Sequence, residues 1–249
     1  MFKKAFIQKQ NKLKIEEELL CSYLERKSIP VEFITQKQID RRRLLIERDT
    51  LVVGDISCVS GALKQLKIDV PEPNSYPDSL KVFLYRKVWD STLSKLMFKI
   101  DHCGSDPVFA KPADSLKRFT GQVFRNSNDF YFLHSVSKKT KIHCSEVVNW
   151  VSEYRVYVVN SEIREVSYYD GDESIKIDNE IVEKSISALD KVNESYAGYG
   201  IDFGVLDTGE TALIEMNDGY GLGAYNIGSK DYSELIIARW FELMESKKE

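Results

Sequence analysis

The sequence has little histidine and little cysteine, and this scarcity argues against several kinds of site. Its 249 residues include three histidines and four cysteines. The cysteines are widely separated and form no C-x-x-C pair, so a disulfide framework is not expected. Two His-Cys dipeptides, at 102–103 and 143–144, lack the ligand spacing typical of structural zinc. With three histidines in all, a histidine-driven hydrolase is a poor candidate.

Motifs of several well-known catalytic classes are also missing. There is no G-x-x-x-x-G-K-[ST] phosphate loop, no G-x-S-x-G elbow, no H-E-x-x-H and no protein-kinase signature. The glycine-rich stretch 219–228 does not match the dinucleotide-binding fingerprint. No apolar run is long enough for a signal peptide or a membrane span, so we expect a cytoplasmic protein without a membrane partner.

The charge balance gives no general attraction to nucleic acid or to an anionic membrane. The formal net charge is -4. The basic runs RRR at 41–43 and SKKTK at 137–141 could still build a local patch, although a solvated helix face is the more frequent explanation for the first. We therefore do not expect a nucleic-acid partner, and we keep a local basic groove as the alternative.

What is present is typical of a soluble globular chain with mixed α and β structure. Hydrophobic residues make up 43% and charged residues 30%. Helical patterns and short apolar strands alternate in the first third of the chain, at 11–28, 31–35, 35–49, 51–53 and 60–66. This alternation predicts a small α/β domain over 1–79, which ends in the proline-rich linker 71–79. Later helices are predicted within 83–100 and over 180–195 and 230–246.

The most informative stretch is an acidic hairpin. Two apolar-rich runs, 203–206 and 211–216, flank the turn sequence DTGE. An even loop centred on Thr208 and Gly209 would place Asp207 opposite Glu210 and Asp202 opposite Glu215. Two facing carboxylates repel, so they need a proton or a cation.

Asn217 lies two residues beyond Glu215 and shares its face of the strand. Oxygen ligands from Asp202, Glu215 and Asn217 would suit Mg²⁺. A one-residue bulge would break the register, and a strand that ends in solvated acids is the alternative interpretation.

Basic side chains precede the hairpin at strand ends. Lys111 lies at the end of the strand predicted at 108–111, and Lys117 follows it. In the alternating strand that begins near 153, Glu153 and Arg155 share one face. Arg155 could bind phosphate or carboxylate with its planar fork, or it could form a structural pair with Glu153.

Taken in chain order, these motifs resemble the ATP-grasp superfamily. They look most like the clade named for one arginine and two lysines, described in viruses and bacterial conflict systems. The resemblance is carried by VFAKPADSLKRFTG, SEYRVYVV and IDFGVLDTGETALIEMNDGYGLGAY and spans residues 80–245. It implies an α+β fold in which two lobes, near 80–150 and 151–249, sandwich ATP within a catalytic domain over 80–249.

The resemblance also implies roles for single residues. The ATP-binding residues would be Lys111, Lys117, Glu146, Val147, Val148, Trp150 and Glu153, with 146–150 as an inter-lobe strand at the adenine and Glu153 near the ribose. The Mg²⁺ ligands would be Asp202, Glu215 and Asn217. The catalytic residues would be Arg155, Lys117 and Arg86. Whether Arg86 or Lys87 replaces an earlier lysine of the superfamily stays open.

The implied reaction is activation of a carboxylate by ATP to an acyl phosphate, followed by attack of an amine, thiol or similar nucleophile and release of ADP. The carboxylate donor and the acceptor, whether small molecule, peptide or protein, are not named by the sequence. The alternatives are a nucleotide-binding adaptor that keeps the fold without turnover, and an ATP-dependent enzyme acting on RNA, which would need a basic groove.

Overall fold

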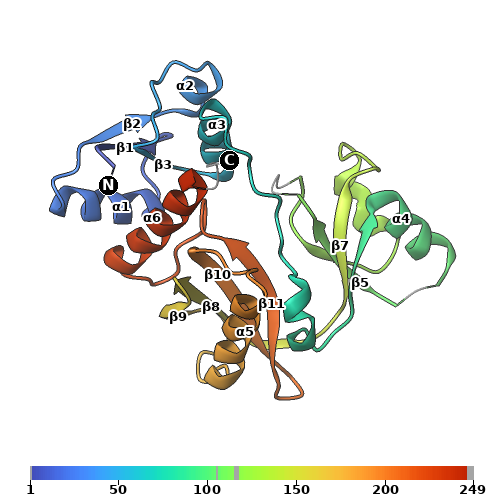
Figure 1. Ribbon diagram of the computed structural model, residues 1–249. Coiled ribbons are helices and arrows are strands. Elements are labelled where there is room, and N and C mark those ends of the chain that lie inside the picture. The colour runs from blue at the N-terminus through green and yellow to red at the C-terminus, as the bar shows by residue number, and fades with distance from the viewer. Residues whose placement is uncertain (1, 105, 115–117, 246–249) are drawn as a thin grey trace.

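The chain folds into three sheets with helices packed against them (Figure 1). The computed structural model describes residues 2–104, 106–114 and 118–245. In chain order the elements are β1 (Lys4–Gln8), α1 (Ile15–Arg26), β2 (Val31–Ile34), α2 (Gln36–Asp40), β3 (Thr50–Val53), α3 (Ile56–Gln65), η1 (Asp78–Phe83), β4 (Val88–Thr92), α4 (Leu93–His102), β5 (Val108–Pro112), β6 (Gln122–Phe124), η2 (Ser127–Leu133), β7 (Lys141–Glu146), β8 (Trp150–Val159), β9 (Glu162–Gly171), α5 (Asn179–Lys191), β10 (Gly198–Leu206), β11 (Thr211–Asp218) and α6 (Ser229–Glu245). The predicted α+β class is confirmed. Among the described residues, no helix combines the length and apolar character needed to cross a bilayer.

The N-terminal sheet is parallel, with strand order β2-β1-β3. Its strands β1 and β3 are almost wholly buried, as expected for a sheet covered on both faces. The sequence analysis missed β1, whose apolar run is only three residues long. The helix predicted over 35–49 is much shorter, because the chain leaves α2 at Asp40 and Arg42 adopts a left-handed φ of 49°.

The middle lobe, residues 88–146, is built on an antiparallel sheet of order β4-β7-β5-β6. Side chains of α4 and η2, among them Leu96 and Phe130, share one buried cluster with strand residues such as Val108 and Phe124. The inter-lobe strand predicted over 146–150 is interrupted, because β7 ends at Glu146 and β8 begins at Trp150. The connecting residues between the lobes are therefore not part of a sheet.

The third sheet, β11-β10-β8-β9, is antiparallel and has two different faces. Tyr154, Val156 and Val158 of β8 share a buried cluster with side chains of α5. Glu153 and Arg155 alternate with them and so point to the opposite face. The predicted period-2 alternation of this strand is confirmed.

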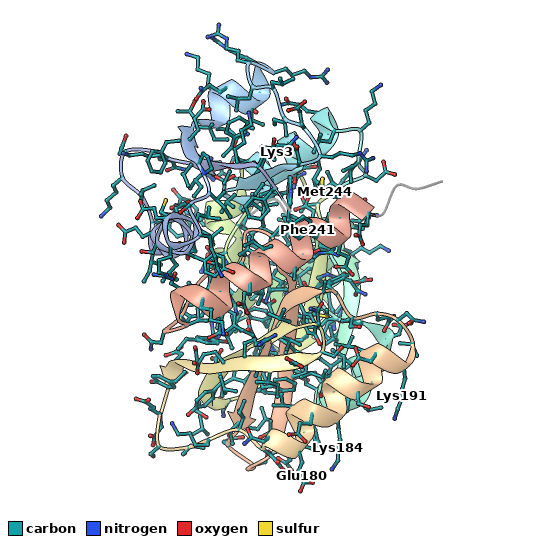
Figure 2. All side chains as sticks on the ribbon, turned by 60° about the vertical axis from the view of Figure 1, so that its left-hand side comes forward. Lys3, Glu180, Lys184, Lys191, Phe241 and Met244 are labelled. Atoms are coloured by element: carbon teal, nitrogen blue, oxygen red, sulfur yellow. The ribbon has the colours of Figure 1, made fainter. Side chains whose placement is uncertain are left out.

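The N-terminal sheet does not close a core by itself, because it shares one buried cluster with α6. The ring of Phe2 lies 5.9 Å from that of Phe241, and the Arg48 guanidinium donates to the Met244 carbonyl at 2.7 Å. Figure 2 shows the end of α6 beside Lys3. The predicted boundary at residue 79 separates two segments of sequence, but the core of the first segment is completed by the last helix.

Candidate active site

The turn between β10 and β11 is one residue longer than the predicted even loop, because three residues, 207–209, separate the paired Leu206 and Glu210. The Leu206 amide donates to the Glu210 carbonyl at 2.9 Å, so Leu206, and not Asp207, faces Glu210. Gly209 closes the turn with a φ of 99°, which explains the glycine at this position. The prediction that Asp207 faces Glu210 is therefore wrong by one residue.

A β-bulge restores the register that the longer turn displaces. Beyond the turn, Phe203 pairs with Leu213, and this register would place Ile214 opposite Asp202. The register shifts at that point, so Ile214 is the extra residue and Asp202 pairs with Glu215. The predicted pairing of Asp202 with Glu215 is confirmed, through two deviations of one residue that cancel.

Arg86 holds the bulged part of β11. Its guanidinium donates to the carbonyls of Leu213 at 2.6 Å and Ile214 at 2.9 Å, and to that of Leu84 at 3.1 Å. It also lies 5.1 Å from the centre of the Trp150 ring. Burial lowers the pKa of Arg86 from its ordinary value. In the structure, Arg86 thus contacts main-chain carbonyls around the bulge, and a direct contact with phosphate stays a prediction.

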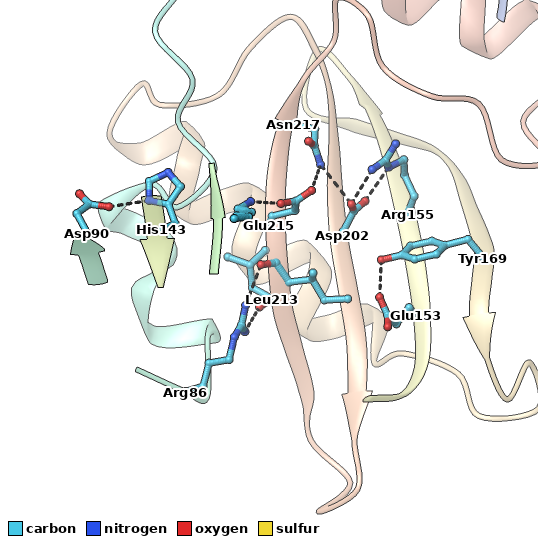
Figure 3. A network of polar contacts seen from close by, with 12 residues as sticks. Arg86, Asp90, His143, Glu153, Arg155, Tyr169, Asp202, Leu213, Glu215 and Asn217 are labelled. Atoms are coloured by element: carbon cyan, nitrogen blue, oxygen red, sulfur yellow. Dashed lines mark hydrogen bonds and ion pairs between the residues drawn. The ribbon is translucent and has the colours of Figure 1, made fainter. Parts of the chain in front are cut away.

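Each of the two facing carboxylates has a cationic partner (Figure 3). Arg155 donates to Asp202 through two parallel bonds of 2.7 Å, and Lys111 forms an ion pair with Glu215. Asn217 lies between the acids, with its amide nitrogen 3.2 Å from Asp202 and 3.1 Å from Glu215. The predicted repulsion is thus offset by two side-chain cations.

Burial and ion pairing act in opposite directions on these groups. Burial raises the pKa of Asp202, against the opposing effect of Arg155. Burial would also raise the pKa of Glu215, but the Lys111 ammonium lowers it below the ordinary value. The pKa of Lys111 is raised because Glu215 and Tyr76 outweigh its burial. Lys111 and Glu215 therefore stabilise each other in their charged forms.

Asp202, Glu215 and Asn217 are a suitable ligand set for Mg²⁺. Their side chains converge, they are all oxygen-bearing, and two are carboxylates. The Asn217 nitrogen faces both acids, so binding of a cation there requires the amide to turn and present its oxygen. No group of three or more His, Cys, Asp or Glu suited to a metal occurs in the described part of the chain. The asparagine is thus essential to this candidate site.

A cavity of about 430 Å³ lies between the middle sheet and the third sheet. It is lined by six of the seven predicted ATP-binding residues, namely Lys111, Glu146, Val147, Val148, Trp150 and Glu153. Arg86, Tyr76 and Glu215 also line it. The seventh, Lys117, lies outside the described residues. Residues that are distant in sequence are thus gathered around one hollow.

The main chain of the inter-lobe connection is free to bind a ligand at this cavity. No hydrogen bond involves the main-chain groups of Val147 or Val148 among the described residues. The connection is fixed on both sides, by the Lys87 amide donating to the Glu146 carboxylate at 2.9 Å and by the Asp207 amide donating to the Asn149 carbonyl at 3.1 Å. A short segment with unpaired donors and acceptors therefore borders the cavity.

Two glycines keep space around Asp202. A Cβ at Gly200 would lie 2.9 Å from Leu222, and one at Gly204 would lie 2.4 Å from the Trp150 ring. Both glycines are two residues from Asp202 and so lie on its face of β10. The pattern G-x-D-x-G thus lets neighbouring elements approach the acidic face closely.

Three tyrosines that the sequence analysis did not assign to the site surround Arg155. The Arg155 guanidinium lies 5.0 Å from the Tyr225 ring, which stacks on Tyr169 at 5.1 Å. Tyr169 donates to Glu153 at 2.8 Å, and burial raises the pKa of Glu153. The Tyr157 hydroxyl accepts from the Tyr225 amide at 2.7 Å, and burial raises the pKa of Tyr157 to about 12. The sequence signal for Tyr157 was that it shares the strand face of Glu153 and Arg155.

Two further cavities continue from the first. One of about 490 Å³ shares Lys111 and Glu215 with the 430 Å³ cavity and is also lined by Arg155 and Asn217. Another of about 600 Å³ shares residues 220–223 with that second cavity and reaches the start of α3 in the N-terminal unit. The acidic pair thus lies between a hollow at the inter-lobe connection and hollows that open toward the N-terminal unit.

Comparison with known families identifies the fold. The model of the ATP-grasp domain, family 2 of the clade named for one arginine and two lysines, matches residues 83–235, which include every candidate site residue. The chain belongs to this family. The resemblance noted in the sequence is confirmed, and the three sheets described above form an ATP-grasp fold.

Solved structures agree on this fold at low sequence identity. D-alanine–D-alanine ligase from Bacillus anthracis is 13% identical, with a TM-score of 0.57 and coverage of 98% of this chain and 99% of that one. N5-carboxyaminoimidazole synthetase from Staphylococcus aureus is 11% identical, with a TM-score of 0.58 and coverage of 97% and 78%. The macrocyclase MdnC, bound with precursor peptide MdnA from Microcystis aeruginosa MRC, is 9% identical, with a TM-score of 0.55 and coverage of 94% and 99%. No curated protein matches the chain.

Proposed function

We propose that the protein is an ATP-dependent ligase that activates a carboxylate as an acyl phosphate for attack by an amine or similar nucleophile. The observation that carries this proposal is the convergence of the cavities. The hollow lined by the predicted nucleotide residues shares Lys111 and Glu215 with the hollow that contains Arg155 and Asn217. Membership of the ATP-grasp family supports an ATP-dependent ligase in general.

The nucleotide would lie in the 430 Å³ cavity. The unpaired main-chain groups of Val147 and Val148 would hold adenine, and Glu153 would lie near the ribose. Lys111, at the end of β5, would contact the phosphates. Lys117 would contact them as well, as predicted from the sequence alone.

The acidic face would hold Mg²⁺ through Asp202, Glu215 and Asn217. A bound Mg²⁺ supplies positive charge that neutralises phosphate oxygens. Arg155 lies beside this set, with its guanidinium held by Asp202 and stacked under Tyr225. It would stabilise negative charge on the transferred phosphoryl group.

The reaction needs no side-chain nucleophile. A carboxylate oxygen of the donor substrate attacks the γ-phosphorus of ATP, and the bond to the β-phosphate oxygen breaks to release ADP. The nucleophile then attacks the carbonyl carbon of the acyl phosphate and inorganic phosphate leaves. Positioned cations are sufficient for the first step, and this site provides Lys111 and Arg155 for it.

Calorimetric titration of the protein with Mg·ATP tests the nucleotide site. We expect binding in the wild type, a loss of at least about tenfold in affinity in Lys111→Met, equivalent to about 1.4 kcal/mol, and no change in Lys37→Met, an exposed lysine of α2. Absence of Mg·ATP binding in the wild type refutes the proposal. ADP formation with a panel of carboxylic acids and amines then tests turnover, and binding without ADP formation favours the adaptor alternative.

A further inference from the structure

The middle lobe exposes aromatic side chains on the side formed by α4 and η2. Phe98 is 62% exposed, Tyr131 is 73% exposed and Phe132 is 82% exposed. In η2, Phe130 and Leu133 are three residues apart and both turn inward, as the 3₁₀ period requires, which leaves Tyr131 and Phe132 facing solvent. The rings of Tyr131 and Phe132 are neighbours, and adjacent exposed aromatic rings of this kind mark contact sites.

An apolar cavity of about 680 Å³ opens beside these rings. Its apolar lining residues are Leu93, Met97, Phe130, Leu133 and Val136, and the rest of the lining is Ser127, Asn128, Tyr131, His134 and Lys138. The Tyr131 ring also packs edge-on against Phe132 at 5.2 Å. We call the exposed rings of Tyr131 and Phe132 together with this cavity the aromatic surface. It offers a hollow for an apolar side chain within a patch of exposed rings.

The charge around the aromatic surface is opposite in sign to that of the whole chain. Residues 93–102 and 127–141 contain five lysines against two aspartates, whereas the whole chain has a net charge of -4. The lysines are Lys95, Lys99, Lys138, Lys139 and Lys141, and all five are exposed. Both aspartates accept hydrogen bonds from neighbouring groups: Asp101 from Ser127 at 2.7 Å, and Asp129 from the Arg125 amide at 2.6 Å. A partner with negative charge is therefore favoured.

The aromatic surface connects with the candidate active site through the basic turn 137–141. Lys138 borders the 680 Å³ cavity, and Lys139 and Lys141 line a neighbouring hollow of about 310 Å³. That hollow shares Glu72, Ala113 and Asp114 with the 490 Å³ cavity that contains Arg155. A chain anchored at the aromatic surface thus has a series of hollows to follow toward Arg155.

We propose that the aromatic surface docks an acidic polypeptide segment carrying an apolar anchor side chain, and that this segment belongs to the substrate that the ATP site modifies. The claim that this segment belongs to the substrate rests on the proposed function, whereas the docking itself does not. A cavity whose walls include the aliphatic side chains of Leu93, Leu133 and Val136 suits an apolar side chain of a polypeptide. A single-stranded nucleic acid would stack its bases on ring faces and leave such a cavity empty.

Selection from a displayed library of random 12-residue peptides tests the docking. Wild-type protein is used for capture, and the double variant Phe132→Ser with Lys138→Glu is used for counter-selection. We expect enriched peptides to contain several Asp or Glu residues and an aromatic or aliphatic residue, and to lose at least about tenfold in affinity for the variant. The matched control carries Leu45→Ser and Lys37→Glu, at exposed positions of the N-terminal unit, and should bind as the wild type does.

Three outcomes would overturn the docking proposal: no enriched peptide, enriched peptides that bind the double variant equally well, or tighter and equally variant-sensitive binding of an oligouridylate. Titration with Mg·ATP separates this result from the proposed function. Both variants keep every residue of the nucleotide cavity, so loss of Mg·ATP binding is not expected in either. Peptide binding by a protein that binds no Mg·ATP would support the docking while refuting the ligase.

Discussion

Replacing Arg86 by lysine tests whether the bulge in β11 depends on its guanidinium. The planar fork donates to two consecutive carbonyls, those of Leu213 and Ile214, and a third bond reaches Leu84. A lysine ammonium has no planar fork and can keep about one of these three bonds. Loss of two charge-assisted bonds at about 1.5 kcal/mol each lowers the free energy of unfolding by about 3 kcal/mol.

For a chain of this size, that loss lowers the melting temperature by about 6–12 °C. Thermal unfolding followed by circular dichroism measures it, with Arg26→Lys as the control. Arg26 makes a single exposed bond to Ser229 at 2.9 Å, so its replacement should change stability by less than about 0.5 kcal/mol. If the bulge is lost, Glu215 no longer faces Asp202, and the Mg²⁺ concentration that supports half-maximal ATP binding should rise in Arg86→Lys. This reasoning is refuted if Arg86→Lys is as stable as the wild type and only its metal-free ATP binding is weakened. Arg86 would then be a phosphate ligand.

Three other substitutions test the charges of the site. Asp202→Asn leaves the buried Arg155 charge without its partner and should cost about 3–5 kcal/mol of stability by denaturant unfolding. Glu153→Gln should become more stable relative to the wild type as pH rises above 4.5, because burial raises the pKa of Glu153 in the folded state. Ionisation of Glu153 therefore lowers the stability of the wild type progressively as pH passes from the ordinary pKa through the raised pKa. Lys111→Met should tighten Mn²⁺ binding without nucleotide, measured by electron paramagnetic resonance, because Glu215 loses its competing cation.

Each of these has a contradicting result. Asp202→Asn should be compared with Asp207→Asn on the hairpin turn, and equal stability of the two variants would remove the buried pair from the interpretation. A difference between Glu153→Gln and wild type that does not change between pH 4 and pH 8 would contradict the raised pKa. Unchanged or weaker Mn²⁺ binding in Lys111→Met, with Lys37→Met as control, would show that Lys111 does not compete with the metal.

The sequence was sufficient to predict features that depend on local periodicity or on ordered motifs. The alternation of Glu153 and Arg155 with Tyr154 and Val156 predicted the face of β8 that meets the site, and this face is confirmed. The order of the lysine, arginine and acidic motifs was enough for the fold, because each motif sits at a strand end or on a strand face. The outcome was less secure at the hairpin: Asp202 faces Glu215 as predicted only because the longer turn and the bulge cancel.

Features that depend on tertiary contacts were beyond the sequence. The bulged strand is contacted by the Arg86 guanidinium, which lies 127 residues before Leu213, and no local pattern reports such a contact. Tyr76 reaches Lys111 from the predicted linker, with the ammonium 4.6 Å from its ring. Tyr225 and Tyr169 meet only when the glycine-rich segment folds back over β8 and β9. Spacing arguments find residues on one element, whereas these contacts join separate elements.

The ion pairs in the site suggest why nucleotide and metal should bind together. Without ligand, the charges of Lys111 and Arg155 balance those of Glu215 and Asp202, so each of these four buried or part-buried charges has a partner. A metal ion alone would displace these cations from the acids and leave them buried without partners, and phosphates alone would leave the acids unpaired. When both ligands bind, the two acids pair with the metal ion and the two side-chain cations pair with phosphate, so no charge is left unpaired. Linkage then requires that each ligand raises the affinity of the other by the same factor.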